Sequence, residues 1–416
     1  MEILETMNTV LMVLFLLCYA YQFFYILVPH VGKDRPHKPV RLRRYAVLIC
    51  ARNEEAVICD LIDSLHAQTY PQELLRIFVM ADNCTDGTAA AARAAGATVY
   101  ERFNRELVGK GYALDVLLKS IARDEPEGFD GYFVFDADNL LRPDYIERMN
   151  ETFCDGNDIV TSYRNSKNYG DNWISAGYGL WFLRESKYLN HARMLLGTSC
   201  AVSGTGFLFS RNVLEEQGGG WPFHLLIEDI EFSVSHILDG YKIAFCPQAE
   251  LFDEQPVSFR QSWRQRMRWS KGYLQVLRHY GWRLFLGIFK GSFSCYDMSM
   301  NILPAFVFSV LSCATNLSLI TMQLLEGASG AAALSVLQML GSMYLTLFVI
   351  GAITTATQWK KIHTAGWKKV VYALTFPVFM FTYVPISLAA IFAKVEWKPI
   401  RHSVTAKQVA AELIHQ

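Results

Sequence analysis

The chain has 416 residues, with 39 basic and 39 acidic side chains and a formal net charge of zero. Apolar residues make up 52% of the chain and charged residues only 19%. The balanced charge creates no field that would attract nucleic acid, so a nucleic-acid-binding protein is not indicated. The apolar excess lies at the two ends of the chain, as in a membrane protein with a soluble middle.

The first apolar run, from about residue 9 to residue 28, is about long enough to span a bilayer. A signal peptide is the alternative, but Glu2 and Glu5 before the run are acidic and no small-residue cleavage site follows it. Basic residues from Lys33 to Arg44 come next, so the positive-inside tendency predicts an external N-terminus and a cytoplasmic domain. The nine scattered cysteines include no C-x-x-C pair, which fits reduced thiols in that compartment.

Short apolar runs that alternate with helical spacing predict a parallel β-α-β sheet after this helix. In such sheets ligands bind at the carboxyl ends of the strands, and three polar clusters follow predicted strands. These clusters are Arg52–Glu55, Asp82–Asp86 and Asp136–Asp138. The predicted strands are 45–51, 75–80, 98–101 and 132–135, and the predicted helices between the first three are 56–68 and 89–95.

The last of these strands delivers Asp136 and Asp138 into a turn that opens with Asn139. Burying two neighbouring carboxylates without a cation is costly, because like charges raise each other's pKa and lose hydration. Carboxylate oxygens together with substrate phosphates suit Mg²⁺ or Mn²⁺. The alternative is an Asx-rich turn after a core strand.

Two glycine-containing segments are candidates for contact with a ligand. Gly109-Lys110-Gly111 offers one positive charge and a backbone that a ligand can approach, although it lacks the Walker spacing. A lysine at a flexible helix start is the alternative. Ser203–Gly206, which includes Gly204 and Thr205, precedes a predicted strand at 207–209 and leaves room for a ligand near the backbone. Between these two segments, aromatic residues at 160–196 either line a sugar-binding groove or form a helix core.

Glu228 and Asp229 emerge from an apolar stretch. Asp229 is a candidate general base, which needs a carboxylate whose pKa is tuned by burial near the reaction centre. The alternative is that both residues start a helix, where acids favour the positive end of the dipole, and both interpretations can hold together.

Arginines and tryptophans interleave at helical spacing in residues 260–269. This pattern has three interpretations. It can be an interfacial membrane helix, a nucleic-acid-binding helix, or a diphosphate site built on Arg268 with Trp269 beside the acceptor. The lack of any other basic patch argues against nucleic acid.

Further apolar runs near 302–325, 332–357 and 370–393 are each about one membrane span long. Lysines at 360–369 indicate a cytoplasmic loop, and the tail from Lys394 to His402 is also basic. Both can be cytoplasmic only if the last run does not cross fully. Pro377 and Pro385 are therefore expected to break it into a re-entrant pair or an interfacial helix.

The ordered motifs resemble those of membrane-bound family 2 glycosyltransferases, the group of cellulose, hyaluronan and poly-N-acetylglucosamine synthases and of ceramide glucosyltransferase. The matching motifs are Asp82, Asp136-Ala137-Asp138, Glu228-Asp229 and the Q-x-x-R-W sequence Gln265–Trp269. Two departures are Ile227, where the family often has threonine, and a tail at 397–401 that matches the family only loosely.

The resemblance implies a GT-A fold, an α/β nucleotide-sugar-binding domain with a mixed, mainly parallel sheet, joined to a helical transmembrane region. It implies that Asp229 is the catalytic base, with Glu228 beside it, and that Asp136 and Asp138 hold Mg²⁺ or Mn²⁺. Acceptor contacts are expected at Gly204, Thr205 and Trp269. The expected nucleotide-sugar-binding residues are Arg52, Glu54, Asp82, Lys110, Asp136, Asp138, Gln265, Arg268 and Trp269.

The predicted activity is that of an inverting, metal-dependent hexosyltransferase that uses a UDP-linked sugar. Elongation of a polysaccharide is the first expectation, and addition of one sugar to a membrane lipid is the alternative. A non-enzymatic scaffold with the same fold is a third, against which the intact acids argue. The expected regions are a transmembrane helix at 1–30, a cytoplasmic catalytic domain at 40–253, interfacial helices at 254–296, a transmembrane or re-entrant region at 297–396 and a cytoplasmic tail at 397–416.

Overall fold

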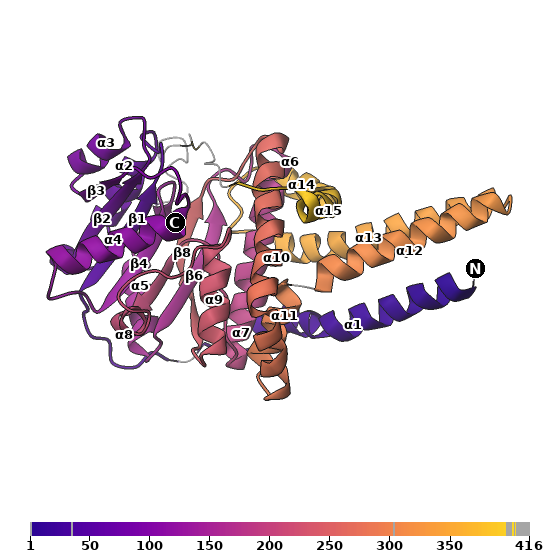
Figure 1. Cartoon of the computed structure of the whole chain (residues 1–416), viewed down its shortest axis with the longest axis horizontal. Coiled ribbons are helices and arrows are strands. Elements are labelled where there is room, and N and C mark those ends of the chain that lie inside the picture. The colour runs from indigo at the N-terminus through magenta and orange to yellow at the C-terminus, as the bar shows by residue number, and fades with distance from the viewer. Residues whose placement is uncertain (1, 35, 303, 397–401, 403, 405–416) are drawn as a thin grey trace.

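The computed structural model describes residues 2–34, 36–302, 304–396, 402 and 404. An α/β domain forms one end of the molecule, and long helices project from its other end (Figure 1). The apolar ends of the sequence thus come together as one helical region, beside a domain built from the middle of the chain.

The α/β domain contains an eight-stranded sheet with the order β3-β2-β1-β4-β7-β6-β8-β5. Pairing is parallel from β3 to β4 and between β6 and β8, and antiparallel where β7 joins β4 and β6 and where β5 joins β8. The prediction of a mixed, mainly parallel sheet is therefore confirmed. The strands are β1 (Tyr45–Ala51), β2 (Leu75–Asp82), β3 (Thr98–Arg102), β4 (Gly131–Asp136), β5 (Leu140–Leu141), β6 (Ile159–Ser166), β7 (Phe207–Ser210) and β8 (Ile243–Asp253).

Helices cover both faces of this sheet. Alternate residues of β1 point to opposite faces, so Leu48 packs in one core with Leu117, and Ile49 packs in the other with Leu61. The shorter elements of the domain are α2 (Ile58–His66), η1 (Gln72–Leu74), α3 (Thr88–Ala94), α4 (Lys110–Asp124), α5 (Tyr145–Cys154), α6 (Trp173–Arg184), the π-helical turn η2 (Glu185–Asn190), α7 (His191–Leu196), α8 (Arg211–Glu216) and α9 (Glu228–Leu238).

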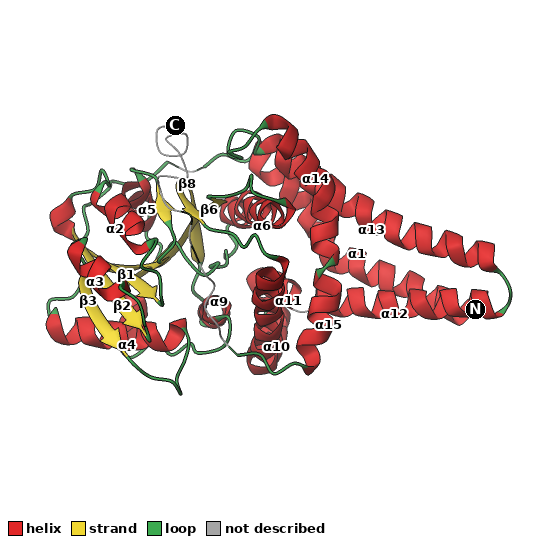
Figure 2. Cartoon of the chain, turned by 90° about the horizontal axis from the view of Figure 1, so that it is seen from above, coloured by secondary structure: helices red, strands yellow, loops and turns green. Residues whose placement is uncertain are grey.

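The remaining helices run in two directions. Helices α1, α12 and α13 lie side by side along the long axis, whereas α10, α14 and α15 run across it next to the α/β domain (Figures 1 and 2). Three described helical stretches are long and apolar enough to cross a membrane: Ile3–Val31, Ser329–Thr357 and Gly366–Phe392. The helices are α1 (Glu2–Val31), α10 (Phe259–Phe289), α11 (Phe293–Ile302), α12 (Pro304–Leu325), α13 (Ser329–Thr357), α14 (Gly366–Phe381) and α15 (Tyr383–Phe392).

The last apolar run is divided in two, with α14 ending at Phe381 and α15 beginning at Tyr383. Pro377 lies inside α14 and Pro385 lies near the start of α15, where each proline removes a backbone donor. The basic tail that follows lies outside the described residues, except for His402 and Val404.

A buried ion pair fastens the helical region to the α/β domain. The guanidinium of Arg193 in α7 donates two hydrogen bonds of 2.8 Å to Asp297 in α11. The hydroxyls of Tyr21 and Tyr25 in α1 also donate to this carboxylate, each at 2.8 Å. The carboxylate in α11 therefore accepts hydrogen bonds from two other helices, α7 and α1, as its burial requires. This arrangement holds α1 against the domain that carries the polar clusters.

Candidate active site

A cavity of about 640 Å³ lies at the carboxyl ends of β1, β2 and β4 and continues to α1, α10 and α13. The structure brings into its lining every predicted site residue except Thr205. The sheet therefore gathers the polar clusters as the parallel arrangement predicted. The predicted residues that line the cavity are Arg52, Glu54, Asp82, Lys110, Asp136, Asp138, Gly204, Glu228, Asp229, Gln265, Arg268 and Trp269.

Asp82 is the last residue of β2 and is held by Arg102, which the sequence analysis did not identify. The Nη1 atom of Arg102 lies 2.5 Å from Oδ1 of Asp82, and both side chains are only 7% exposed. The two residues are register partners in the parallel pair of β2 and β3. Arg102 also donates to the carbonyl of Leu107 at 2.5 Å, so its position is fixed from two sides. A carboxylate held in this way presents a rigid group to the cavity.

Lys110 is the first residue of α4, and its ammonium points into the cavity wall. It donates to Oδ1 of Asp136 at 2.5 Å and to the carbonyl of Gly204 at 2.7 Å. Burial acts to lower the pKa of Lys110, but the charges of Asp136 and Glu228 outweigh burial and raise it. The glycine before it has a φ of 145°, which only glycine adopts readily. Lys110 is therefore a charged member of the site.

Thr205 lies behind the cavity rather than in its lining. Its side chain is 2% exposed, and its hydroxyl donates to Oδ1 of Asn139. The same hydroxyl accepts the backbone N–H of Asp136 at 2.9 Å. The acceptor contact predicted for Thr205 has no counterpart in this geometry, because the hydroxyl is consumed in holding the turn that carries Asp136. Thr205 thus holds the backbone of Asp136, whose carboxylate lines the cavity.

Asp138 is buried and accepts the backbone N–H of Glu254 at 2.8 Å. Burial acts to raise its pKa, but the charges of His402 and Lys167 prevail and lower it, so the carboxylate is ionised at neutral pH. Within the described residues, no group of three or more His, Cys, Asp or Glu side chains is arranged to hold a metal. Mg²⁺ and Mn²⁺ bind through one or two carboxylates completed by substrate phosphates and water. The pair Asp136 and Asp138 fits that kind of site.

His402 approaches the same end of the cavity from the C-terminal segment. Its Nδ1 atom lies 3.0 Å from both carboxylate oxygens of Glu54. Burial acts to lower the pKa of His402, but the charges of Asp138 and Glu54 raise it to about 10. The imidazole is therefore cationic at neutral pH, and its positive charge offsets the negative charges of Asp138 and Glu54.

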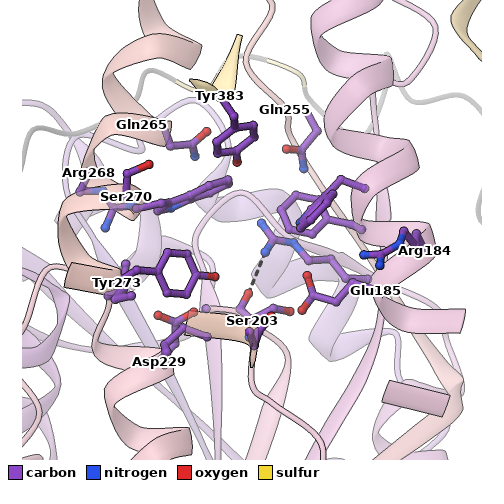
Figure 3. Close-up of a pocket in the computed structure, with 18 of the residues that line it drawn as sticks. Arg184, Glu185, Ser203, Asp229, Gln255, Gln265, Arg268, Ser270, Tyr273 and Tyr383 are labelled. Atoms are coloured by element: carbon purple, nitrogen blue, oxygen red, sulfur yellow. Dashed lines mark hydrogen bonds between the residues drawn. The ribbon is translucent and has the colours of Figure 1, made fainter. Parts of the chain in front are cut away.

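Glu228 and Asp229 begin α9, as the helix-start interpretation predicted, and both also line the cavity. Burial is the main cause that raises the pKa of Glu228 to about 7, and the charge of Asp229 adds to it. Burial also raises the pKa of Asp229, while Lys110 and Arg268 oppose the rise. Asp229 faces the cavity (Figure 3). A carboxylate with a raised pKa in a cavity is suited to accept a proton.

Arg164 and Asp253 form a second ion pair that the sequence analysis did not identify. The Nε atom of Arg164 donates to Oδ2 of Asp253 at 2.7 Å, and its Nη1 atom donates to the carbonyl of Ser203 at 2.7 Å. Burial is the main cause that raises the pKa of Asp253 to about 6, which the charge of Arg164 opposes. This pair joins β6 and β8 to the loop before β7, next to Gly204.

Helix α10 presents three predicted residues to the cavity, Gln265, Arg268 and Trp269, which lie on one face at spacings of three and four. Arg268 donates to the carbonyl of Leu226 at 2.9 Å, just before the acidic pair. The Oε1 atom of Gln265 is buried and has no hydrogen-bond partner among the described residues. An orphaned acceptor in a cavity wall needs a donor from a ligand or water.

Arg266 points away from the cavity. It is fully buried and donates to the carbonyl of Phe379 at 3.1 Å and to the hydroxyl of Thr382 at 2.7 Å. Arg266 therefore fixes α10 to the junction of α14 and α15. The aromatic residues of 160–196 divide in the same way, because Tyr163 and Tyr178 are buried in cores while Trp181 lines the cavity.

Comparison with known proteins gives a consistent result. Residues 43–272 match the family described as "Glycosyltransferase like family 2". A probable glycosyltransferase, YdaM, of Bacillus subtilis is 26% identical over 253 residues, which cover 57% of this chain and 56% of that protein. A beta-monoglucosyldiacylglycerol synthase of Synechocystis sp. is 25% identical over 252 residues, which cover 57% of this chain and 49% of that one. The chain thus spans about half the length of these relatives.

Among solved structures, the mannosyltransferase PcManGT from Pyrobaculum calidifontis, in complex with GDP-Man and Mn²⁺, matches with a TM-score of 0.59. The match covers 92% of this chain and 99% of that chain, at 17% sequence identity. At this identity the likeness concerns the fold alone. It extends the agreement from the α/β domain to most of the helical region.

Proposed function

Because the chain belongs to glycosyltransferase family 2, we propose that it transfers a sugar from a nucleotide sugar to a hydroxyl of a membrane lipid. The observation that carries this proposal is the continuity of the cavity. It joins the acidic pair Glu228–Asp229 to apolar residues of α1 and α13, two of the helices that could cross a membrane. A lipid acceptor can therefore reach the base while its chains remain among the helices.

The nucleotide sugar is expected at the end of the cavity formed by β1, β2 and β4. Asp82, fixed by Arg102, is proposed to bind the base, which we expect to be uracil. Arg268 lies near the acidic pair and neutralises negative charge on the diphosphate as the sugar departs. A Mg²⁺ or Mn²⁺ ion bound by Asp136 and Asp138 supplies further stabilisation of the leaving diphosphate. The Pyrobaculum mannosyltransferase, which binds Mn²⁺ together with GDP-Man, supports this assignment.

In the proposed reaction, Asp229 accepts the proton of the acceptor hydroxyl. The acceptor oxygen forms a bond to the anomeric carbon, and the bond from that carbon to the diphosphate oxygen breaks. The electron pair of the broken bond leaves with the nucleoside diphosphate, and the configuration at the anomeric carbon inverts. One base suffices for this single displacement, whereas a retaining glycoside hydrolase needs a second carboxylate as nucleophile.

We further propose that α1, α12 and α13 cross the membrane and that α10, α14 and α15 lie at its cytoplasmic surface. The two directions of these helices in Figures 1 and 2 support this arrangement. The interruption of the last apolar run at Thr382 supports it as well. The expected domain boundaries, with the catalytic domain at 40–253 on the cytoplasmic side, are kept in this proposal.

Synthesis of a polysaccharide remains the second candidate, because a growing glycan could follow the same extension of the cavity between the helices. The size of the product separates the two. Purified protein in lipid nanodiscs would be given UDP-glucose, UDP-N-acetylglucosamine or GDP-mannose with Mn²⁺ or Mg²⁺. A single glycolipid is the result we expect, and a ladder of glycans would replace the proposal by the second candidate. Release of no nucleoside diphosphate from any donor would contradict both.

A further inference from the structure

Glu185 is a carboxylate of the cavity to which the proposed reaction assigns no task. It begins the π-helical turn η2, which follows α6 without a break. Such turns are rare, and many occur at functional sites. Figure 3 shows Glu185 beside Arg184, across the cavity from Asp229 and Tyr273. The turn thus puts an acidic group on the wall opposite the proposed base.

The carboxylate of Glu185 receives no hydrogen bond from any residue that the structure describes, and it interacts with nearby arginines through charge alone. The guanidinium groups of its neighbours are engaged elsewhere. Arg184 donates to Oε1 of Gln22 in α1 at 2.8 Å, and Arg164 is bound to Asp253. Other carboxylates of the cavity, such as Asp138, have a donor within the protein. A carboxylate without one can accept hydrogen bonds from a ligand.

Tyr273 lies between the two carboxylates. It belongs to α10, lines the cavity, and carries a hydroxyl on which the charges of both Glu185 and Asp229 act. In Figure 3 its ring extends into the cavity above Asp229. Tyr273 therefore offers a hydroxyl to a ligand that reaches from one carboxylate to the other.

This part of the cavity borders its apolar extension. Phe23 and Ile26 of α1 and Leu347 of α13 line the same space, and the bond from Arg184 to Gln22 ties α1 to the start of η2. A headgroup placed between Glu185 and Tyr273 would have its hydrocarbon chains beside these helices.

The charges select the chemistry of that headgroup. A phosphate would bring negative charge between Glu185 and the pair Glu228–Asp229, where like charges repel. Neutral hydroxyls carry no such charge, and each of them can donate one hydrogen bond to a carboxylate. The nucleophilic hydroxyl must face Asp229, so a hydrogen bond to Glu185 requires a second hydroxyl on the same headgroup.

Building on the proposed function, we propose that Glu185 and Tyr273 form an acceptor subsite for a membrane lipid whose neutral headgroup carries at least two hydroxyls. A sugar or another polyol meets this requirement, whereas a diacylglycerol, with a single hydroxyl, fills it only in part. The subsite therefore predicts a glycolipid as the preferred acceptor.

Lipid binding tests this inference without requiring turnover. The full chain would be placed in phosphatidylcholine nanodiscs containing monoglucosyl-dioleoylglycerol, dioleoylglycerol or dioleoylphosphatidic acid, and the retained lipid would be counted by native mass spectrometry. We expect the wild type to retain the glucosyl lipid at least about tenfold better than either other lipid. Glu185→Ala is expected to lose this preference, and Tyr273→Phe, which removes only the hydroxyl, is expected to weaken it.

Binding of uridine diphosphate, measured on the same samples, reports whether each variant is folded. Glu73→Gln changes an exposed residue that is not part of the cavity lining, serves as the control and should behave as the wild type. Equal retention of the glucosyl lipid by the wild type, Glu185→Ala and Tyr273→Phe would overturn the inference, and so would a wild-type preference for phosphatidic acid. A wild type that binds neither uridine diphosphate nor GDP would instead overturn the proposed function, and the inference with it.

Discussion

The ammonium of Lys110 lies 2.5 Å from a carboxylate oxygen of Asp136 and 2.7 Å from the carbonyl oxygen of Gly204. A Cβ atom on Gly204 would lie 3.6 Å from Oδ2 of Asp229, so the backbone of this loop passes close to the proposed base. One cation therefore ties the proposed metal site to the place where the acceptor would be deprotonated. Several consequences of this geometry can be measured.

Replacing Lys110 by methionine removes the ammonium and leaves Asp136 without its charged donor. Because a hydrogen bond to a charged group contributes about 1.5–3 kcal/mol, the KM for the nucleotide sugar should rise about tenfold to a hundredfold. Steady-state kinetics with varied donor would measure this change. Lys119→Met is the matched control, because Lys119 lies on the same helix and pairs with Asp115 at the exposed surface. An unchanged donor KM in Lys110→Met would remove Lys110 from the site.

Arg102→Met should both destabilise the domain and weaken nucleotide binding. The substitution leaves Asp82 buried without its partner, which typically costs about 3–5 kcal/mol of folding free energy. Thermal unfolding and titration with uridine diphosphate would report the two effects. Arg93→Met is the control, because the side chains of Arg93 and its partner Glu101 are 49% and 39% exposed and that pair should contribute less than about 1 kcal/mol. Equal unfolding temperatures for the two variants would refute the structural role given to Arg102.

Removal of divalent metal should abolish transfer. We expect EDTA to stop product formation and added Mn²⁺ to restore it. Without a cation, the two carboxylates would repel the departing diphosphate instead of stabilising it. Asp138→Asn should raise the Mn²⁺ concentration needed for half-maximal activity by at least about tenfold. Asp63→Asn, at an exposed position of α2, should leave this concentration unchanged. Full activity in EDTA would show that the acidic pair does not serve a metal.

The raised pKa of Glu228 predicts that this residue makes the folded state less stable as the pH rises. Its pKa rises from the ordinary value of 4.5 to about 7 on folding, chiefly because of burial. The stabilising contribution of the protonated group is therefore complete below pH 4.5 and is lost as the pH rises to about 7. Glu228→Gln is neutral at every pH, so its unfolding temperature relative to the wild type should increase across this window and level off above it. A difference that stays constant with pH would contradict the burial of an ionisable Glu228.

Sequence motifs alone predicted which acidic residues lie at the strand ends, and the structure explains why no further information was needed. Asp136 and Asp138 follow a strand whose four preceding residues are all apolar, so their position at the carboxyl edge of the sheet could be predicted. The same holds for Asp82. The helical spacing of Gln265, Arg268 and Trp269 likewise predicted that they share one face.

The partners of these groups could not be found in the same way. Arg102 meets Asp82 only because β2 and β3 pair in a particular register, which no local pattern reveals. Thr205 lies in a loop predicted to contact the acceptor, but its hydroxyl turns inward to Asn139. Glu185 depends on a π-helical turn that helical periodicity does not distinguish from ordinary helix. The break between α14 and α15, in contrast, was predicted from Pro377 and Pro385.

The central claim is that the protein transfers a sugar and that Asp229 is the base. The substitution Asp229→Asn tests this claim most directly. The substitution keeps the shape of the side chain and removes its ability to accept a proton at neutral pH. The rate of sugar transfer should fall by about 10²–10⁴-fold, while the affinity for uridine diphosphate stays within about twofold of the wild type. A variant that transfers sugar at close to the wild-type rate would contradict the claim.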